Sequence, residues 1–123
     1  MDLDGFKNIN DTYGHSAGDD VLKESARRLD SVVRASDTVA RIGGDEFLIL
    51  LSDLVKEENI DSILIKIRNF FNEPFYINDI FVPLGCSLGV AYMPREAKSG
   101  IDLVRIADQR MYEEKKKHQE NME

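Results

Sequence analysis

The chain has 123 residues, 42% of them hydrophobic and 32% charged, which is enough to bury the core of one domain and typical of a globular protein. Its formal net charge is −7, and this argues against nucleic acid as a partner, because nucleic-acid binders normally present a basic face. No apolar run approaches membrane-spanning length and no signal peptide is present, so we expect a cytoplasmic domain without membrane contact.

The first four residues are predicted to end a β-strand. Asp2 and Asp4 stand two residues apart, so both side chains are expected on one face of that strand. The segment from Gly5 to Gly14 then suits a short helical turn, with Phe6 and Ile9 as its core anchors.

A longer helix is predicted next. Ser16 followed by Asp19 has the spacing of a capping box, which predicts a helix from about Ala17 to Ala35. One apolar stripe of this helix is expected to face the core and a polar face to meet water. The stripe is Leu22, Ala26, Leu29 and Val33, and the polar face is Lys23, Arg27, Arg28 and Asp30.

Two apolar runs flank the sequence RIGGDEF, from Arg41 to Phe47, and predict a β-hairpin with Gly43 and Gly44 at the bend. Adjacent glycines leave no Cβ in the way, so a ligand can lie directly on the backbone. Asp45 and Glu46 bring two carboxylates to the same rim. This suits a phosphorylated ligand bridged by a divalent metal, because Mg²⁺ usually binds one or two carboxylates plus substrate phosphates. Taken alone, a Gly-Gly-Asp sequence in a hairpin more often reflects ordinary turn chemistry than a binding site.

Residues 53–59 are polar and loop-like. Apolar residues at helical spacing then predict an amphipathic helix that packs on the core and ends before Pro74. These residues are Ile60, Ile63, Leu64, Ile67, Phe70 and Phe71.

Two strands are predicted after this helix. Residues 75–83 form the first, with a turn near Asn78 and Asp79, and residues 85–93 form the second. Cys86, the single cysteine, lies beside an apolar run and is interpreted as a buried structural thiol.

A last helix is predicted to begin at Ser99 and Asp102, which repeat the capping-box spacing. Its apolar positions are Ile101, Val104, Ala107 and Met111, and the sequence is charge-rich beyond Tyr112. Residues 1–123 therefore read as one α+β domain with helices packed on a mainly antiparallel sheet.

Four segments together resemble the GGDEF family, the diguanylate cyclases. They are DLDGFKNINDTYGHSAGD (residues 2–19), RIGGDEF (41–47), SLGVA (87–91) and ADQRMY (107–112). The resemblance covers nearly the whole chain and implies a palm-like, ferredoxin-related sheet of the kind found in nucleotide cyclases. It also implies that the chain starts partway through the first strand of such a domain, without the usual preceding helix.

The activity implied by the resemblance is condensation of two GTP molecules into cyclic di-GMP with release of two pyrophosphates. Each 3′-hydroxyl attacks the α-phosphate of the other GTP, in a homodimer. The family's ligands for Mg²⁺ or Mn²⁺ fall on Asp2, the backbone carbonyl of Leu3 and Asp45. Asp45 also matches the family position assigned as proton acceptor, and Glu46 lies beside it. Lys7 matches a position that stabilises negative charge in the transition state.

The family's substrate contacts fall on Asn10, His15 and Asp19. Asn10 and Asp19 would meet the guanine, whose N1–H and amino group can donate to a carboxylate. Lys115 matches a triphosphate-binding lysine, but the arginine expected four residues later is Gln119. A neutral amide cannot replace the paired, charge-assisted bonds of a guanidinium to phosphate.

Arg34 and Asp37 fit the Arg-x-x-Asp inhibitory site of the family, where an arginine and a carboxylate would grip the guanine and phosphate groups of the product. Lys66 and Arg68 are both candidates for a second cation at this site.

Two other functions remain open from the sequence. Gln119 and the absent N-terminal segment favour a catalytically silent domain that binds GTP or cyclic di-GMP and signals through a partner, although Lys116 or Lys117 could compensate for the missing arginine. The intact Asp2, Lys7 and RIGGDEF argue against it. A calcium-binding or structural module built on DLDG is disfavoured, because the segment lacks the glycine position and terminal glutamate of a twelve-residue calcium loop.

Overall fold

The computed structural model describes residues 1–52 and 58–121. Its elements are β1 (Asp2–Leu3), α1 (Phe6–Tyr13), α2 (His15–Val32), β2 (Thr38–Gly43), β3 (Glu46–Leu50), α3 (Glu58–Asn72), β4 (Phe75–Ile77), β5 (Ile80–Val82), β6 (Cys86–Ser87) and α4 (Gly100–Asn121). The predicted loop at 53–59 lies outside the described residues except for its last two positions, which already belong to α3. The α+β class is confirmed.

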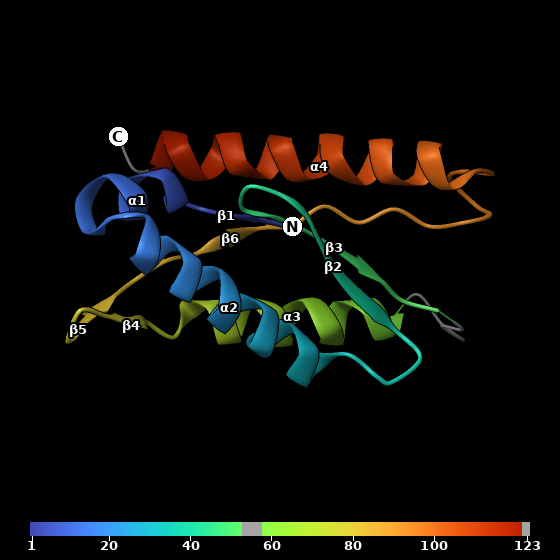
Figure 1. The fold of residues 1–123 in the computed structure, drawn as a ribbon. Coiled ribbons are helices and arrows are strands. Elements are labelled where there is room, and N and C mark those ends of the chain that lie inside the picture. Colours follow the sequence, from blue (N-terminus) through green and yellow to red (C-terminus); the bar gives the residue numbers. More distant parts are fainter. Residues whose placement is uncertain (53–57, 122–123) are drawn as a thin grey trace.

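A four-stranded sheet in the order β2-β3-β1-β6 forms the centre of the fold, and all of its pairings are antiparallel. Asp2 lies opposite Glu46 on one neighbouring strand and opposite Ser87 on the other. Figure 1 shows α4 along one side of this sheet and α2 with α3 on the other. The short strand β1 is therefore held between the RIGGDEF hairpin and β6, beneath α4.

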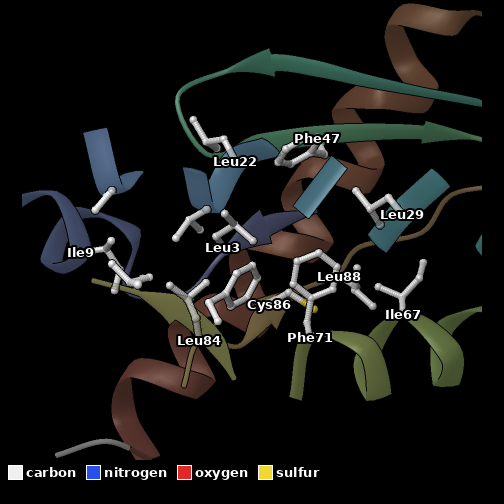
Figure 2. Close-up of a cluster of buried hydrophobic side chains, with 14 residues drawn as sticks. Leu3, Ile9, Leu22, Leu29, Phe47, Ile67, Phe71, Leu84, Cys86 and Leu88 are labelled. Atoms are coloured by element: carbon white, nitrogen blue, oxygen red, sulfur yellow. The ribbon is translucent and has the colours of Figure 1, made fainter. Parts of the chain in front are cut away.

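The main core lies between the sheet and the pair α2 and α3 (Figure 2). Its buried side chains include Leu3, Phe47 and Cys86 from the sheet, Leu22 and Leu29 from α2, and Ile67 and Phe71 from α3. Burial raises the pKa of the Cys86 thiol to about 12. The interpretation of Cys86 as a buried thiol is confirmed.

The bounds of α2 differ from the prediction. The helix begins at His15 and ends at Val32, and Ser16 lies inside it without acting as a cap. Gly14 occupies the N-cap position with φ of 92°, which L side chains rarely adopt, so the glycine allows the chain to turn directly from α1 into α2. At the other end Val33 has an extended backbone, although its N–H still donates a helical hydrogen bond to Leu29 O.

Arg28 was predicted to face water, and this is wrong. The residue is 6% exposed, and its guanidinium donates to Phe70 O (2.7 Å), Glu73 O (2.8 Å) and Pro74 O (3.1 Å). It also lies 3.9 Å from the centroid of the Phe75 ring. The last carbonyls of a helix lack intrahelical donors, so Arg28 from α2 satisfies the end of α3.

The predicted turn at Asn78 and Asp79 is confirmed. Both residues have positive φ, 48° and 67°, and they join β4 to β5 in a separate two-stranded sheet. The strand predicted over 85–93 is mostly wrong, because only Cys86–Ser87 pair, with the two residues of β1. Beyond them the chain packs on a helix: a Cβ at Gly89 would lie 2.0 Å from the backbone oxygen of Ala107 in α4.

The N-terminal cap of α4 is confirmed, since Asp102 N donates to Ser99 Oγ at 3.2 Å. Met111 is buried as predicted, but Ile101 is 83% exposed and Val104 is also exposed. Ala107 is partly buried, also as predicted, while Leu103 and Ile106 take the inward positions that were expected for Ile101 and Val104. Among the helices of residues 1–52 and 58–121, none is both long and apolar enough to cross a membrane.

Candidate functional site

Three elements bring opposite charges together at β1. Lys115 Nζ of α4 lies 2.7 Å from Asp2 Oδ2, 3.3 Å from the backbone oxygen of Leu3 and 3.9 Å from Asp45 Oδ2. The three groups predicted as metal ligands thus converge on a single ammonium group.

Backbone pairing positions Asp45 beside β1. Leu3 N donates to Asp45 O at 3.3 Å, and Phe47 N donates to Met1 O at 2.8 Å. Gly44 has φ of 51° at the bend, and Arg41 Nε donates to Gly44 O at 2.9 Å. The turn is therefore held by β1 through Leu3 N and by β2 through the Arg41 side chain. The positioning role of Arg41 was not predicted, although the residue lies within the RIGGDEF motif.

Gly43 and Gly44 leave the rim of the hairpin open. Both are exposed, and a Cβ built at either would meet no atom within 4 Å apart from its chain neighbours. The prediction that both glycines form the bend is confirmed in part: the residue with positive φ is Gly44, while Gly43 ends β2 opposite Glu46.

The ammonium of Lys115 does not fully compensate the carboxylates of Asp2 and Asp45. Asp2 is 7% exposed and its Oδ1 is buried without a hydrogen-bond partner among the described residues. Burial and the neighbouring carboxylate of Asp2 together raise the pKa of Asp45 to about 6, and the positive charge of Lys115 offsets only part of this effect. A buried carboxylate oxygen without a donor is costly unless a cation or a water meets it.

These groups fit a divalent cation. Two carboxylates and a backbone carbonyl are the hard oxygen ligands that Mg²⁺ prefers. Asp2 Oδ1, which accepts no hydrogen bond from the described residues, is available as one of these ligands. Within the described part of the chain, no group of three or more His, Cys, Asp or Glu side chains could hold a metal. The remaining ligands would have to be carbonyl oxygen, water or substrate, as is usual for Mg²⁺.

A second polar cluster lies next to this site and was not predicted. Ser87 Oγ donates to Asp4 Oδ1 at 2.7 Å, and His118 Nδ1 lies 2.8 Å from Asp4 Oδ2 and 3.0 Å from Ser87 Oγ. Asp2 and Asp4 thus both point toward α4, so they share one face of the chain as their spacing predicted. No local pattern marks Ser87 or His118, because they lie 31 residues apart and meet only through the fold.

Glu114 joins α4 to α3 and to the chain after β6. Its carboxylate accepts from Arg68 at 2.7 and 2.9 Å and from Leu88 N at 3.1 Å. Burial opposes its ionisation, but the hydrogen bonds from Arg68 and Leu88 prevail and lower its pKa. Arg68, a candidate for the inhibitory site, is therefore engaged with α4, whereas Lys66 is exposed.

A groove of about 380 Å³ lies between α2 and the hairpin. Its lining is Asp19, Leu22, Lys23, Ala26, Arg41 and Phe47, which gives an apolar floor with a charged rim. Of the predicted substrate contacts, Asp19 lines this groove.

The other predicted substrate contacts lie around α1. Asn10 packs against Gly18, where a Cβ would lie 1.9 Å from Asn10 Oδ1. Lys7 and His15 are exposed. Glu46, on β3, is half-buried opposite Asp2.

Arg34 and Asp37 contact each other in the turn after α2. Arg34 Nε and Nη2 each lie 3.2 Å from an oxygen of Asp37, and Arg34 N donates to the same carboxylate at 2.9 Å. Arg34 lowers the pKa of Asp37, which also accepts from Ser52 N at 3.2 Å. The two side chains are thus held together, and the hydrogen bond from Ser52 N holds Asp37 near the end of β3.

The end of α4 faces solvent around Gln119, which stands where the family has an arginine. Gln119 and Lys117 are exposed, and Lys116 Nζ lies 5.6 Å from the centre of the Tyr112 ring.

An antiparallel sheet with helices on both faces, and with carboxylates on its central strand and the adjacent hairpin, is the architecture of a nucleotide-cyclase-like domain. The sequence model of the family described as "Diguanylate cyclase, GGDEF domain" matches residues 1–121, and the chain belongs to this family.

Individual relatives agree with this assignment. The chain is 40% identical over 119 residues to the signaling protein YkoW of Bacillus subtilis, and 39% identical over 115 residues to MucR of Pseudomonas aeruginosa, a bifunctional diguanylate cyclase/cyclic di-GMP phosphodiesterase. These matches cover 96% and 94% of this chain but only 15% and 17% of those proteins. Among solved structures, the GGDEF domain of YfiN or TpbB from P. aeruginosa matches with a TM-score of 0.88 and 39% identity, over 94% of this chain and 73% of that one.

Proposed function

We propose that residues 1–123 act as one GGDEF domain with diguanylate cyclase activity, joining two GTP molecules into cyclic di-GMP and releasing two pyrophosphates. The observation that carries the proposal is the convergence of Asp2, the Leu3 carbonyl and Asp45, with Asp2 Oδ1 buried and unpartnered. The family membership and the activity named for MucR support it. Because GTP is a cytoplasmic nucleotide, we infer that the reaction takes place in the cytoplasm.

Asp2, the carbonyl of Leu3 and Asp45 would hold Mg²⁺ or Mn²⁺. Such an ion lowers the pKa of a bound hydroxyl and neutralises charge on phosphates. Asp45 is proposed to take the proton of the 3′-hydroxyl as the general base. Glu46 assists from the neighbouring position on β3.

The remaining residues bind and orient GTP. The guanine is proposed to lie in the groove over Leu22 and Phe47, with Asp19 accepting from its N1–H and amino group. Asn10 contacts the base from α1. Gly43 and Gly44 allow the phosphates to approach the hairpin backbone.

Cationic side chains would then neutralise the phosphates of the bound GTP. Lys115 and Lys7 are proposed for this role, with His15 as a further contact. One chain holds one GTP, so two copies of the chain must meet face to face for the reaction.

The proposal is tested by incubating the purified chain with GTP and Mg²⁺ and measuring cyclic di-GMP by chromatography and mass spectrometry. Asp45→Asn should abolish product while the chain stays folded. Asp30→Asn, which removes an exposed carboxylate of α2, is the matched control and should retain activity. Retained turnover in Asp45→Asn would refute the assignment of Asp45.

Arg34 and Asp37 are proposed to bind cyclic di-GMP and so to inhibit the enzyme. Their arrangement as one charged turn supports this, since a guanidinium and a carboxylate side by side offer donors and acceptors to guanine and phosphate. Arg34→Ala should weaken inhibition by cyclic di-GMP, whereas Arg105→Ala on α4 should not. Equal inhibition in both variants would show that the motif is accidental.

A second candidate is a domain without activity that binds GTP or cyclic di-GMP, and the exposed Gln119 favours it. Calorimetric titration separates the two. Binding of either nucleotide by a chain that makes no product under the conditions above would support the silent domain, and product would exclude it.

A further inference from the structure

A single ammonium group sits where the three cation-binding oxygens converge. Lys115 Nζ contacts Asp2 Oδ2 at 2.7 Å and the oxygen of Leu3 at 3.3 Å, and Asp45 Oδ2 is 3.9 Å away. The lysine side chain is 21% exposed and that of Asp2 is 10% exposed, so water reaches the lysine more readily than the carboxylate.

A divalent cation and this ammonium group cannot be held by the same oxygens at the same time. Mg²⁺ binds oxygen at about 2.1 Å. Whichever oxygen of the Asp2 carboxylate it uses, an ion that also binds the Leu3 carbonyl and Asp45 Oδ2 would lie close to Lys115 Nζ, which is 3.3 Å from the first of these oxygens and 3.9 Å from the second. Two positive charges at such a distance in a half-buried site repel strongly, because the effective dielectric is far below that of water.

We propose that Lys115 is an internal counter-ion that holds the cation position, and that a divalent cation binds only by displacing it. The proposal rests on the proposed function and adds a step to it. The displaced ammonium stays beside the site and needs a new anionic partner, which the triphosphate of GTP provides. Cation and nucleotide therefore favour each other's binding through one lysine, and the coupling must be reciprocal.

The rest of α4 stays in place during this exchange. Glu114, the preceding residue, is held by Arg68 and Leu88 N, and His118, one turn later, contacts Asp4 and Ser87. These contacts do not involve Lys115, so its side chain can leave Asp2 by rotation about its own bonds.

The first test measures Mn²⁺ binding to the chain without nucleotide, by calorimetry and by the electron paramagnetic resonance signal of free Mn²⁺. Lys115→Met removes the competing ammonium and should tighten Mn²⁺ binding by about tenfold or more, because displacement no longer breaks a charge-assisted hydrogen bond. Lys117→Met makes the same charge change at an exposed position of the same helix and should leave the affinity close to that of the parent chain.

Equal Mn²⁺ affinity in the parent chain and in Lys115→Met would overturn the proposal while leaving the cation site of the proposed function intact. Absence of Mn²⁺ binding in both would overturn the cation site itself, and the proposal with it.

The second test needs no variant. Lysine acetylation of the parent chain, followed by mass spectrometry, reports how accessible each amine is. Lys115 should react slowly without metal and several-fold faster after addition of Mg²⁺ in the absence of nucleotide, while Lys117 should react at one rate throughout. A Lys115 rate that Mg²⁺ leaves unchanged or lowers would contradict displacement.

Discussion

At the scale of single residues, the raised pKa of Asp45 has a measurable consequence for stability. The pKa is about 6 in the folded chain against an ordinary value of 3.8, so between these values the folded state binds a proton that the unfolded state has lost. The contribution of Asp45 to stability therefore falls as the pH rises from about 4 to about 6.

We predict that Asp45→Asn gains stability relative to the parent chain over this pH range. Urea unfolding of both proteins between pH 4 and pH 7, in the presence of EDTA, gives the difference in free energy of unfolding. A difference that does not change with pH would mean that the carboxyl titrates alike in the folded and unfolded states.

The charged residues of the site were predictable to different degrees. Asp2 and Asp45 were found from the motifs, because each motif fixes one carboxylate beside a turn or strand end. The contact of Lys115 with Asp2 was not, since the two lie 113 residues apart and only the fold brings them together.

At the scale of elements, Arg28 joins two helices that the sequence presents as independent. We predict that Arg28→Ala costs about 3 kcal/mol of unfolding free energy, because it removes a charged donor from one carbonyl in the last turn of α3 and from two carbonyls just after it. Thermal and urea unfolding would measure this. Arg27→Ala changes an exposed neighbour and is expected to have little effect, so equal losses in both variants would contradict the assigned role.

Gly89 sets how closely the chain after β6 packs on α4. A Cβ at this position would lie 2.0 Å from Ala107 O and 2.3 Å from Met111 N, both backbone atoms that cannot move independently. Gly89→Ala is therefore predicted to destabilise the chain by about 1–3 kcal/mol or more.

Gly100→Ala is the matched control for this substitution, because no atom lies within 4 Å of the added methyl group and the position begins α4. It should leave the midpoint of urea unfolding nearly unchanged. An unchanged midpoint for Gly89→Ala as well would show that α4 does not pack on this segment.

Elements were predicted well where local chemistry decides them. The bends at Gly44 and at Asn78 follow from residues that tolerate positive φ, and the Ser99 cap follows from its spacing. Prediction failed where contacts with residues far away in the sequence determine the length of an element or the burial of a side chain. The strand expected over 85–93 is short because β1 pairs with only two of its residues, and Arg28 is buried because α3 ends beside it.

At the scale of the whole molecule, the α+β class followed from the order of elements, but the strand order did not. Sequence patterns give no reason for β1 to lie between β3 and β6, and that central place is what aligns Asp2 with the hairpin. Only the family resemblance carried the sheet topology, and the solved GGDEF domain of YfiN or TpbB agrees with it.

We propose that two copies of this chain, each holding one GTP, join their substrates. The most direct test is the initial rate of cyclic di-GMP formation at saturating GTP and Mg²⁺ over a wide range of chain concentrations. We predict that the rate rises with the square of the concentration while most chains are monomeric, and linearly once they are paired. A rate proportional to concentration down to the lowest measurable level, or no cyclic di-GMP at any concentration, would contradict the account.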